Sequence, residues 1–386
     1  GVDFGFFNSR LTGTIDAYWN TTKDLLMKTA IPGITGFTST YANVGQTSNK
    51  GIEIALQGVL VKTRDWNVTA GFNINFNRGK VDKLADNVTG LYGTEWATSS
   101  TFPKSDYVLK EGRPVGLVRG LTADGFYTTD DFTYANGVYT LKEGVADVSS
   151  AVFPNYHLHN GMNERPAGQL AYPGMAKFKD LNDDGIINDD DVDVIGDMTP
   201  VHTGGFNINA TYKNFDLGLY FNWSYGNEIY NVNKLAALYG YKEGAVYENK
   251  LSIVKDCYKI YDVVNGELVA LTTPEQLNAA NANAKLPLAY SENGYVSTLG
   301  IEDGSYLRLN TLTLGYTLPK SMLQKAGISN LRVYGSIYNV FTITGYSGID
   351  AEVSTSTSTK TYPQLGMDWG TYPRARSFVL GVNLSF

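Results

Sequence analysis

RSFVLGVNLSF, residues 376–386, ends the chain and decides its fold. The terminal residues of most domains are loose, whereas these alternate with period two up to the last aromatic. A strand that is apolar toward lipid and small or polar toward a lumen is how a transmembrane β-barrel is built. The stretch therefore predicts an outer-membrane barrel. Its apolar face holds Phe378, Leu380, Val382, Leu384 and Phe386, and its other face Ser377, Gly381, Asn383 and Ser385.

The composition agrees with an all-β membrane protein without proving one. Of 386 residues 43% are hydrophobic, yet the mean hydropathy is −0.19 and no long apolar run occurs. A transmembrane helix needs about 20 consecutive apolar residues, so helical membrane proteins are excluded. The 27 tyrosines, 41 glycines and 12 prolines suit many extended strands with aromatic girdles. A soluble β-sandwich or β-helix is equally compatible with these proportions.

Charge and cysteine content exclude further classes of protein. The net charge of −7 and the pI near 5.1 offer no basic face for nucleic acid. Cys257 is the single cysteine, so neither a disulfide framework nor a thiolate metal cluster is expected. No signal peptide precedes Gly1, although an outer-membrane protein needs one. We therefore expect that the natural protein begins upstream of Gly1.

Eight further segments repeat the terminal alternation, with Asn, Thr, Ser, Gly and Asp between the apolar positions. Together with the last strand they predict about nine strands, and an extra pair around GRPVGLVRG would keep that number odd. Bacterial barrels made from one chain have even strand numbers, so this pattern predicts the C-terminal part of a larger barrel. The segments cover residues 2–6, 15–19, 52–60, 68–76, 206–210, 215–223, 312–316 and 331–337.

The connections alternate between short and long, as periplasmic turns and extracellular loops do in outer-membrane barrels. Short links cover residues 8–10, 62–65 and 213–214, and the intermediate link 319–330 can hold one or two helical turns. Structureless connections above about 15 residues are unusual in a globular domain. The predicted long loops cover about 21–47, 79–200, 227–304 and 344–374.

One loop has the spacing of a calcium site. Gly185 supplies the sharp turn at the sixth position, and Ile187 at the eighth is apolar, as the anchor of such a loop should be. The alternative is a solvated acidic turn, because Asp and Asn favour turns for their own backbone hydrogen bonds. A bound Ca²⁺ here would stiffen the loop. The predicted ligands are Asp180, Asn182, Asp184, the Ile186 carbonyl, Asn188 and Asp191.

No other constellation supports chemistry. His157 and His159 form a His-x-His pair. Two ligands do not make a zinc site, so we expect exposed loop histidines, and we assign no role to His202. No nucleophile elbow or phosphate-binding glycine loop occurs, so we do not expect an enzyme. The loop aromatics are girdle or packing residues, or stacking platforms for sugars and peptide side chains. They are Tyr92, Trp96, Tyr156, Tyr239, Tyr241, Tyr346, Tyr362 and Trp369.

Residues 178–231, FKDLNDDGIINDDDVDVIGDMTPVHTGGFNINATYKNFDLGLYFNWSYGNEIYN, carry a specific family pattern. An acidic Asp-x-Asn-x-Asp-Gly loop precedes an Ile-Gly and Pro turn, a Gly-Gly-Phe strand and a Phe-Asp-Leu strand. In this order the motifs resemble the C-terminal barrel portion of the SusC-like TonB-dependent outer-membrane transporter family of Bacteroidetes. GVDFGFFNSRLTGTIDAYWNTTKDLL, SNKGIEIAL, EGRPVGLVRGLTADGFY, SYLRLNTLTLGYTLP and ISNLRVYGSIYNVFTITGYSGID extend the resemblance over nearly the whole chain.

This resemblance implies a 22-stranded barrel with an N-terminal plug in the bacterial outer membrane. It also implies import of oligosaccharides (glycans), or of peptides, driven by the TonB complex and assisted by a SusD-like surface lipoprotein. The plug and the segment that contacts TonB would belong to an N-terminal portion absent from this sequence. Lipid would surround the barrel, and no nucleic acid is expected. A passive outer-membrane porin and a calcium-stiffened, secreted β-rich adhesin are the alternatives.

Overall fold

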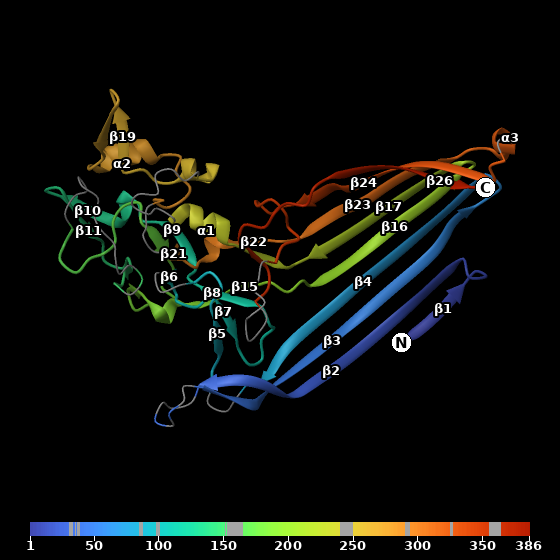
Figure 1. Ribbon diagram of the computed structural model, residues 1–386. Coiled ribbons are helices and arrows are strands. Elements are labelled where there is room, and N and C mark those ends of the chain that lie inside the picture. The colour runs from blue at the N-terminus through green and yellow to red at the C-terminus, as the bar shows by residue number, and fades with distance from the viewer. Residues whose placement is uncertain are drawn as a thin grey trace.

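One antiparallel sheet of nine strands dominates the computed structural model (Figure 1). We call this sheet the wall. Its strand order is β1-β2-β3-β4-β16-β17-β23-β24-β26, so each strand pairs with its neighbour along the wall. The structure describes residues 1–30, 34, 36, 39–84, 88–97, 101–150, 152, 165–239, 250–289, 294–324, 327–354 and 364–386.

Each wall strand contains one of the nine alternating segments, so the predicted strands are confirmed. The two longest, β2 and β3, have 20 and 24 residues, whereas β1 has 5. The bounds are β1 (Val2–Phe6), β2 (Leu11–Ala30), β3 (Ser39–Lys62), β4 (Trp66–Lys83), β16 (His202–Tyr212), β17 (Phe215–Tyr225), β23 (Tyr306–Thr317), β24 (Asn330–Thr344) and β26 (Ser377–Ser385).

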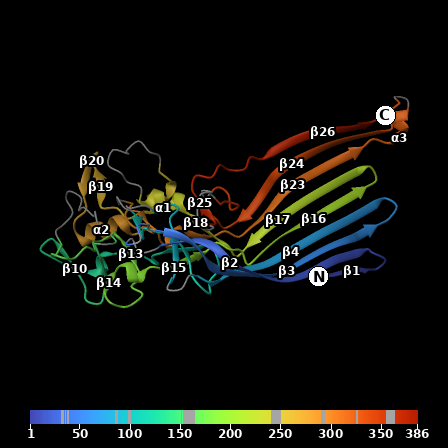
Figure 2. The same cartoon turned by 60° about the horizontal axis from the view of Figure 1, so that its bottom comes forward.

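The short connections lie at one end of the wall, which we call the turn end (Figure 2). They include the 213–214 turn and the link between β23 and β24, in which α3 (Lys320–Leu323) forms the predicted helical turn. The longer connections all leave from the opposite end, the loop end. The turn end thus holds the short links that the sequence predicts, whereas the connection between β2 and β3 at the loop end is not long.

The predicted long loop over 21–47 is wrong. Strands β2 and β3 stay paired from Thr21↔Ser48 to Ala30↔Ser39, with irregular register only near Leu25. Beyond the apolar part of the wall the period-two alternation is lost, because β2 runs through Thr21, Thr22, Lys23 and Asp24 and then has Leu25 and Leu26 at adjacent positions. The backbone ladder continues without that pattern. Likewise β4 continues to Lys83, past the predicted loop start at 79.

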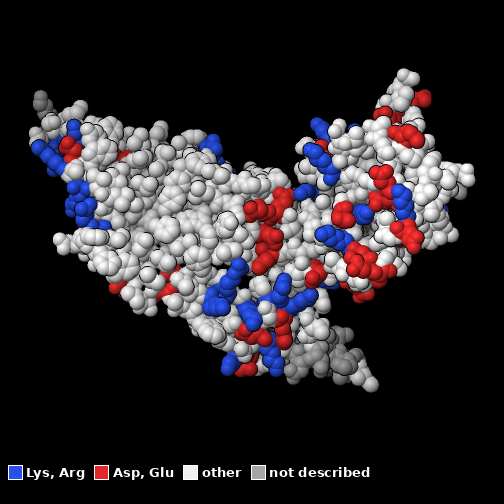
Figure 3. Space-filling model, turned by 180° about the vertical axis from the view of Figure 1, so that it is seen from behind, with Lys and Arg blue, Asp and Glu red and all other residues white. Residues whose placement is uncertain are grey.

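One face of the wall is apolar across neighbouring strands. Phe206 is the direct partner of Phe72 on β4 and of Phe221 on β17, and the rings of Phe206 and Phe221 stack with centroids 4.3 Å apart. Toward β26, Leu314 lies opposite Gly335, which lies opposite Leu380. Seen from behind, the wall shows a broad area almost free of charged side chains (Figure 3). Leu380 is 89% exposed, which in water would be costly and in lipid is favourable.

Aromatic rings border this apolar face at the turn end. The Trp66 and Tyr212 ring centroids lie 4.4 Å apart, and those of Phe215 and Tyr316 lie 4.7 Å apart. Tyr212 and Phe215 are direct partners across the β16–β17 turn. A row of amphipathic rings at one level of a barrel is typical of the membrane–water interface.

A second aromatic row borders the apolar face at the loop end. His202 packs edge-on against Phe76 with centroids 5.4 Å apart and stacks on Tyr225 at 5.0 Å, and Trp223 Nε1 donates to His202 Nδ1 (3.0 Å). From Trp66 to Phe76 the chain advances about 33 Å along the strand, or about 25 Å across a membrane at the usual tilt. That distance matches the apolar band of an outer-membrane barrel.

The long connections fold together into a separate body at the loop end, which we call the cap (Figures 1 and 2). Its core draws residues from all three connections between wall strands, at 84–201, 226–305 and 345–376, and includes six fully buried tyrosines. The GRPVGLVRG stretch contains β8 of a small cap sheet in its last four residues, so it adds no strand to the wall. Those tyrosines are Tyr107, Tyr127, Tyr139, Tyr172, Tyr230 and Tyr295.

Short strands and helices build the cap. Among the described residues, no helix is both long and apolar enough to cross a membrane. The helices are α1 (Val232–Tyr239) and α2 (Pro274–Asn281). The strands are β5 (Leu91–Gly93), β6 (Thr101–Phe102), β7 (Tyr107–Leu109), β8 (Leu117–Gly120), β9 (Ala123–Phe126), β10 (Phe132–Ala135), β11 (Val138–Leu141), β12 (Asp147–Val148), β13 (Ala176–Phe178), β14 (Ile186–Ile187), β15 (Asp193–Asp197), β18 (Glu228–Asn231), β19 (Tyr261–Val264), β20 (Glu267–Ala270), β21 (Gly294–Tyr295), β22 (Ile301–Asp303) and β25 (Met367–Asp368).

Candidate functional site

The polar face of the wall, which we call the lumen face, is lined by side-chain amides and hydroxyls. Asn207 and Asn209 alternate with the apolar residues of β16, and Asn209 Nδ2 donates to Asn207 Oδ1 (3.0 Å). Tyr220 on β17 donates its hydroxyl to Asn209 Oδ1 (3.1 Å). These groups both donate and accept hydrogen bonds, so the face suits a polar solute that does the same.

The same polar character continues onto β23 and β24. Asn310 Nδ2 donates to Asn222 Oδ1 (2.7 Å), and Asn222 Nδ2 donates to the Tyr306 hydroxyl (3.2 Å). Nearer the turn end, the hydroxyls of Thr313 and Ser336 lie 2.8 Å apart. The lumen face of these strands is therefore rich in neutral hydrogen-bonding groups, and it also carries ion pairs: Arg332 with Asp216 near the turn end, and Arg308 with its partners at the loop end.

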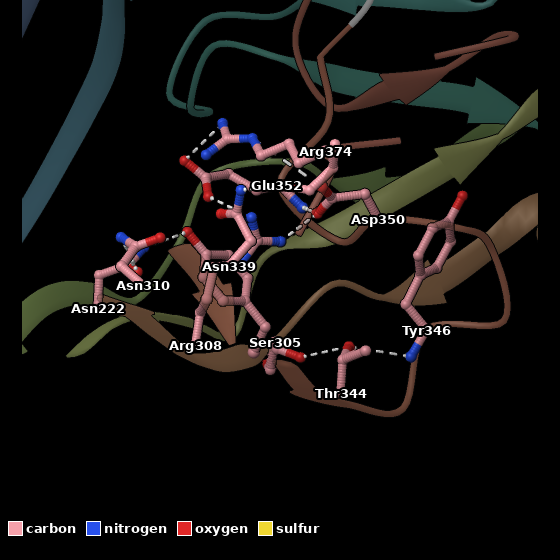
Figure 4. A network of polar contacts seen from close by, with 12 residues as sticks. Asn222, Ser305, Arg308, Asn310, Asn339, Thr344, Tyr346, Asp350, Glu352 and Arg374 are labelled. Atoms are coloured by element: carbon pink, nitrogen blue, oxygen red, sulfur yellow. Dashed lines mark hydrogen bonds and ion pairs between the residues drawn. The ribbon is translucent and has the colours of Figure 1, made fainter. Parts of the chain in front are cut away.

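A network of ion pairs holds the last long connection against the lumen face (Figure 4). Arg308 of β23 is 3% exposed and pairs with Asp350 and, at 3.4 Å, with Glu352. Arg374 contacts the same two acids, with its Nη2 3.0 Å from Glu352. The four groups balance in charge and are mutually bonded, so the loop is fixed by matched partners and no ion is left alone in the interior.

A second polar cluster ties the cap to the same connection. Glu302 of β22 accepts from Lys234 Nζ (3.0 Å), from the Ser347 hydroxyl (2.8 Å) and from the Ser347 backbone N–H (2.9 Å). Burial raises the pKa of Glu302, but the hydrogen bonds from Ser347 and Lys234 outweigh it, so the pKa lies below the usual 4.5. The ionised carboxylate therefore joins α1, β22 and the chain after β24.

The most deeply buried acid of the cap serves the backbone. Asp106 is fully buried and accepts from the N–H groups of Glu95 (2.8 Å), Trp96 (2.9 Å) and Ala97 (3.1 Å). Burial raises its pKa above 3.8, and the three amides counteract part of that increase. Such a carboxylate organises a turn that would otherwise leave three amides without partners.

The predicted calcium loop folds as a compact turn on the cap. Asp180 accepts from the N–H of Asp184 (3.2 Å) and of Gly185 (2.7 Å), and Asp184 Oδ1 accepts from the Ile186 N–H (2.9 Å). Gly185 has φ +85°, a left-handed conformation that glycine adopts without strain. The structure thus brings Asp180, Asn182 and Asp184 together, with Asn182 Nδ2 donating to Asp184 Oδ2 (3.0 Å).

The last two predicted ligands bind the loop backbone. Asp191 is fully buried, and its two oxygens accept from Leu181 (2.7 Å) and Asn188 (2.8 Å). Asn188 in turn accepts from the Asp190 N–H (2.7 Å). Within the described residues, no three Asp, Glu, His or Cys side chains gather closely enough to hold a metal ion. Each carboxylate oxygen keeps a second lone pair, so the donor chemistry still fits a hard cation.

The remaining predicted residues have diverse environments. Tyr346 is buried and donates to Asp368 Oδ2 (2.7 Å), and Trp96 packs edge-on against Tyr230 at 6.4 Å, so both are packing residues of the cap. Tyr92 and Trp369 are 51% and 49% exposed. Tyr156, His157, His159, Tyr241 and Tyr362 lie outside the described residues, as does the side chain of Tyr239.

Sequence reasoning missed two features. One is the place of His202 in the loop-end aromatic row. Its position two residues before Gly204 on β16 puts it on the outward face, and this was the sequence signal that could have predicted it. The ion-pair network of Arg308 was missed because its acids lie 42 and 44 residues away in a loop. Only the presence of an arginine between Leu307 and Leu309 indicated a polar partner on the lumen face.

Known proteins share both the sequence and the fold of the chain. No protein-family model matches it. TonB-dependent receptor P3 of Formosa agariphila is 30% identical over 391 residues, which cover 100% of this chain and 33% of that protein. TonB-dependent receptor SusC of Bacteroides thetaiotaomicron is 28% identical over 394 residues, covering 100% and 31%. The chain thus spans about a third of the length of these relatives.

A solved structure has the same architecture. The RagAB peptide transporter superposes with a TM-score of 0.67 at 23% sequence identity, over 100% of this chain and 34% of its own. The structure of the RagAB peptide importer in the open-open state gives a TM-score of 0.62. The wall and cap therefore have the fold of an outer-membrane transporter. Over all of its length, the chain belongs to the SusC-like TonB-dependent receptors, which are proteins of the bacterial outer membrane.

Proposed function

We propose that the protein takes part in the TonB-dependent import of a polar nutrient through the outer membrane. The observation that carries this proposal is the two-faced wall: an apolar face bordered by two aromatic rows, and a lumen face of amides and hydroxyls beneath a folded cap. A solute would be bound and passed along the lumen face, with no covalent chemistry. The family supports this role.

The nutrients that fit are oligosaccharides, with peptides as the second candidate class. Sugar hydroxyls and peptide amides each donate and accept hydrogen bonds, as do Asn207, Asn209 and Tyr220. The motif resemblance to the SusC-like family favours the first class, and similarity to the RagAB peptide transporter supports the second. We propose a SusD-like surface lipoprotein as the partner at the cap and the TonB complex as the source of energy.

Growth tests distinguish import from the alternatives. A strain that lacks the gene should lose growth on one defined class of glycans or peptides and regain it from a plasmid copy. Inactivating TonB should abolish that growth, because the proposed transport is coupled to energy. Growth that persists without TonB would indicate a passive porin, and release of the protein by salt without detergent would indicate a secreted adhesin.

Variants on one strand test the lumen face itself. Replacing Asn207 and Asn209 by Leu removes polar groups from the lumen and should slow growth on the nutrient while the protein still reaches the membrane. The matched control is Ile208→Val, which lies between them on the apolar face of the same strand. If both variants grow like the wild type, the lumen face of β16 has no part in transport.

We further propose that the 180–191 loop binds one Ca²⁺ and stiffens the cap. The hydrogen bonds that gather Asp180, Asn182 and Asp184 around Gly185 support this proposal. Weak affinity for Ca²⁺ is sufficient in an extracellular loop, because extracellular Ca²⁺ sites function with low affinity. The role is structural, because β14 of this loop pairs with β12 of the cap.

A further inference from the structure

A row of cations lies on the apolar side of the wall, just beyond its apolar part. Trp19 is the direct partner of Lys50, and Lys50 is the direct partner of Arg78, so the three side chains point to one face. Register identifies that face, because two residues nearer the turn end the same ladder carries Ile52 and Phe76. Directly paired residues on antiparallel strands share a face, and so do residues two apart.

The next pair along the ladder extends the row. Lys80 lies opposite Ser48, again on the outward face and farther toward the loop end. The order on this face is therefore apolar residues, then the aromatic row of Phe76 and His202, then cations. Figure 3 shows Lys and Arg, interspersed with Asp and Glu, where the area free of charge meets the loop end.

These side chains line a pocket of about 430 Å³ between β2, β3, β4 and the 112–114 segment of the cap. Trp19, whose side chain is 77% exposed, is one of the lining residues. Two acids also line it and keep their charge: Asp82 accepts from the Ser48 hydroxyl (2.9 Å), and Asp197 accepts from the Thr199 N–H (2.9 Å). Three cations against two acids leave a positive pocket.

The cations are only weakly engaged by the acids. Arg78 Nη1 lies 3.9 Å from Asp197 Oδ2, at the edge of an ion pair, and its side chain is 44% exposed. Lys50 and Lys80 are exposed and form no ion pair with another described residue. Cationic groups that face outward at the level of the headgroups attract anionic lipid.

We propose that this rim pocket binds a phosphate group on the headgroup of an anionic glycolipid in the leaflet at the loop end. The phosphate would lie among Lys50, Arg78 and Lys80, the sugar against Trp19, and the acyl chains along Ile52 and Phe76 below. The ligand is a lipid because the pocket opens on the lipid-facing side of the wall, directly above apolar residues that are 47% and 39% exposed. This site is separate from the lumen face, so it goes beyond transport.

The test measures lipid binding by the intact, detergent-purified membrane protein with native mass spectrometry. The probes are diphosphoryl lipid A, its dephosphorylated form and inorganic phosphate. The variant Lys50→Gln/Arg78→Gln/Lys80→Gln should bind diphosphoryl lipid A about 100-fold more weakly, since each cation near a membrane surface contributes severalfold. The matched control is Lys62→Gln/Arg64→Gln/Lys213→Gln, with the same loss of charge at the turn end.

Phosphate-dependent binding of lipid A that is lost in the rim variant and kept in the turn-end variant supports the site. Equal binding by the rim variant and the wild type, or an equal loss in both variants, overturns it. Binding of inorganic phosphate as tight as that of diphosphoryl lipid A, or no preference for the phosphorylated form of the lipid, also overturns it. If the triple variant does not assemble, Lys50→Gln alone should weaken binding about fivefold. Because import is not measured, failure here leaves the proposed function untouched.

Discussion

Two buried aspartates stabilise irregular segments of the cap by accepting backbone hydrogen bonds. Asp106 and Asp191 are both fully buried, and each accepts hydrogen bonds from backbone amides of its own loop. A buried amide without a partner costs about 1–3 kcal/mol, so one carboxylate that accepts several amides stabilises an irregular segment. Short aspartates thus replace the regular hydrogen bonds that helices and long strands would provide.

The proposed calcium site makes a prediction at this scale. Because a hard cation offsets the repulsion between Asp180 and Asp184, removing Ca²⁺ with EGTA should lower the Tm of the purified protein, and added Ca²⁺ should restore it. Asp180→Asn and Asp184→Asn should abolish the response in a thermal-shift assay. The control is Asp183→Asn in the same loop, whose φ of +59° suits asparagine equally well. An unchanged Tm in EGTA would contradict the site.

Glu302 makes the cap sensitive to acid. Its pKa in the folded state lies below the 4.5 of the unfolded chain, so its stabilisation is present above pH 4.5 and is lost as the pH falls through the folded-state pKa. We expect proteolysis of the cap to increase below pH 4.5. Glu302→Gln should cost about 2 kcal/mol at neutral pH and flatten that pH dependence. Exposed Glu267→Gln is the control, and an identical pH profile in both variants would refute this role.

At the scale of elements, the wall was predictable because lipid and lumen impose opposite demands on successive residues. All nine strands and the helical turn at α3 followed from that alternation and from the lengths of the links. The loop-end halves of β2 and β3 were not predictable, because a strand outside the membrane needs no apolar face. The two-residue strands of the cap, such as β14, are too short to show any period.

Neighbouring positions on β23 test the two faces. Leu312 lies between Leu219 and Ile337 near the middle of the apolar band, so Leu312→Arg should cost about 2–4 kcal/mol. Thr311, on the opposite face between Tyr220 and Tyr338, should accept arginine at little cost. Denaturant titration of the protein in liposomes measures both. Similar losses for both variants would mean that the faces are assigned wrongly.

At the scale of the whole molecule, the candidate site arises where wall and cap meet. The Arg308 network joins β23 to the chain before β26, and Glu302 joins the same connection to α1. None of these pairings has a local signal in the sequence, because the partners lie tens of residues apart. The lumen chemistry of each strand could be predicted, whereas its enclosure by the cap could not.

The construction of the cap from three separate connections has a consequence for the order of assembly. Wall hairpins such as β16–β17 need only local contacts, which form quickly. The cap core, in contrast, joins residues as distant as Phe102 and Met367. The entropy lost on closing such long loops opposes these contacts unless the intervening strands are already in place. The cap should therefore fold last, so a folded cap would indicate that the wall beneath it is already complete.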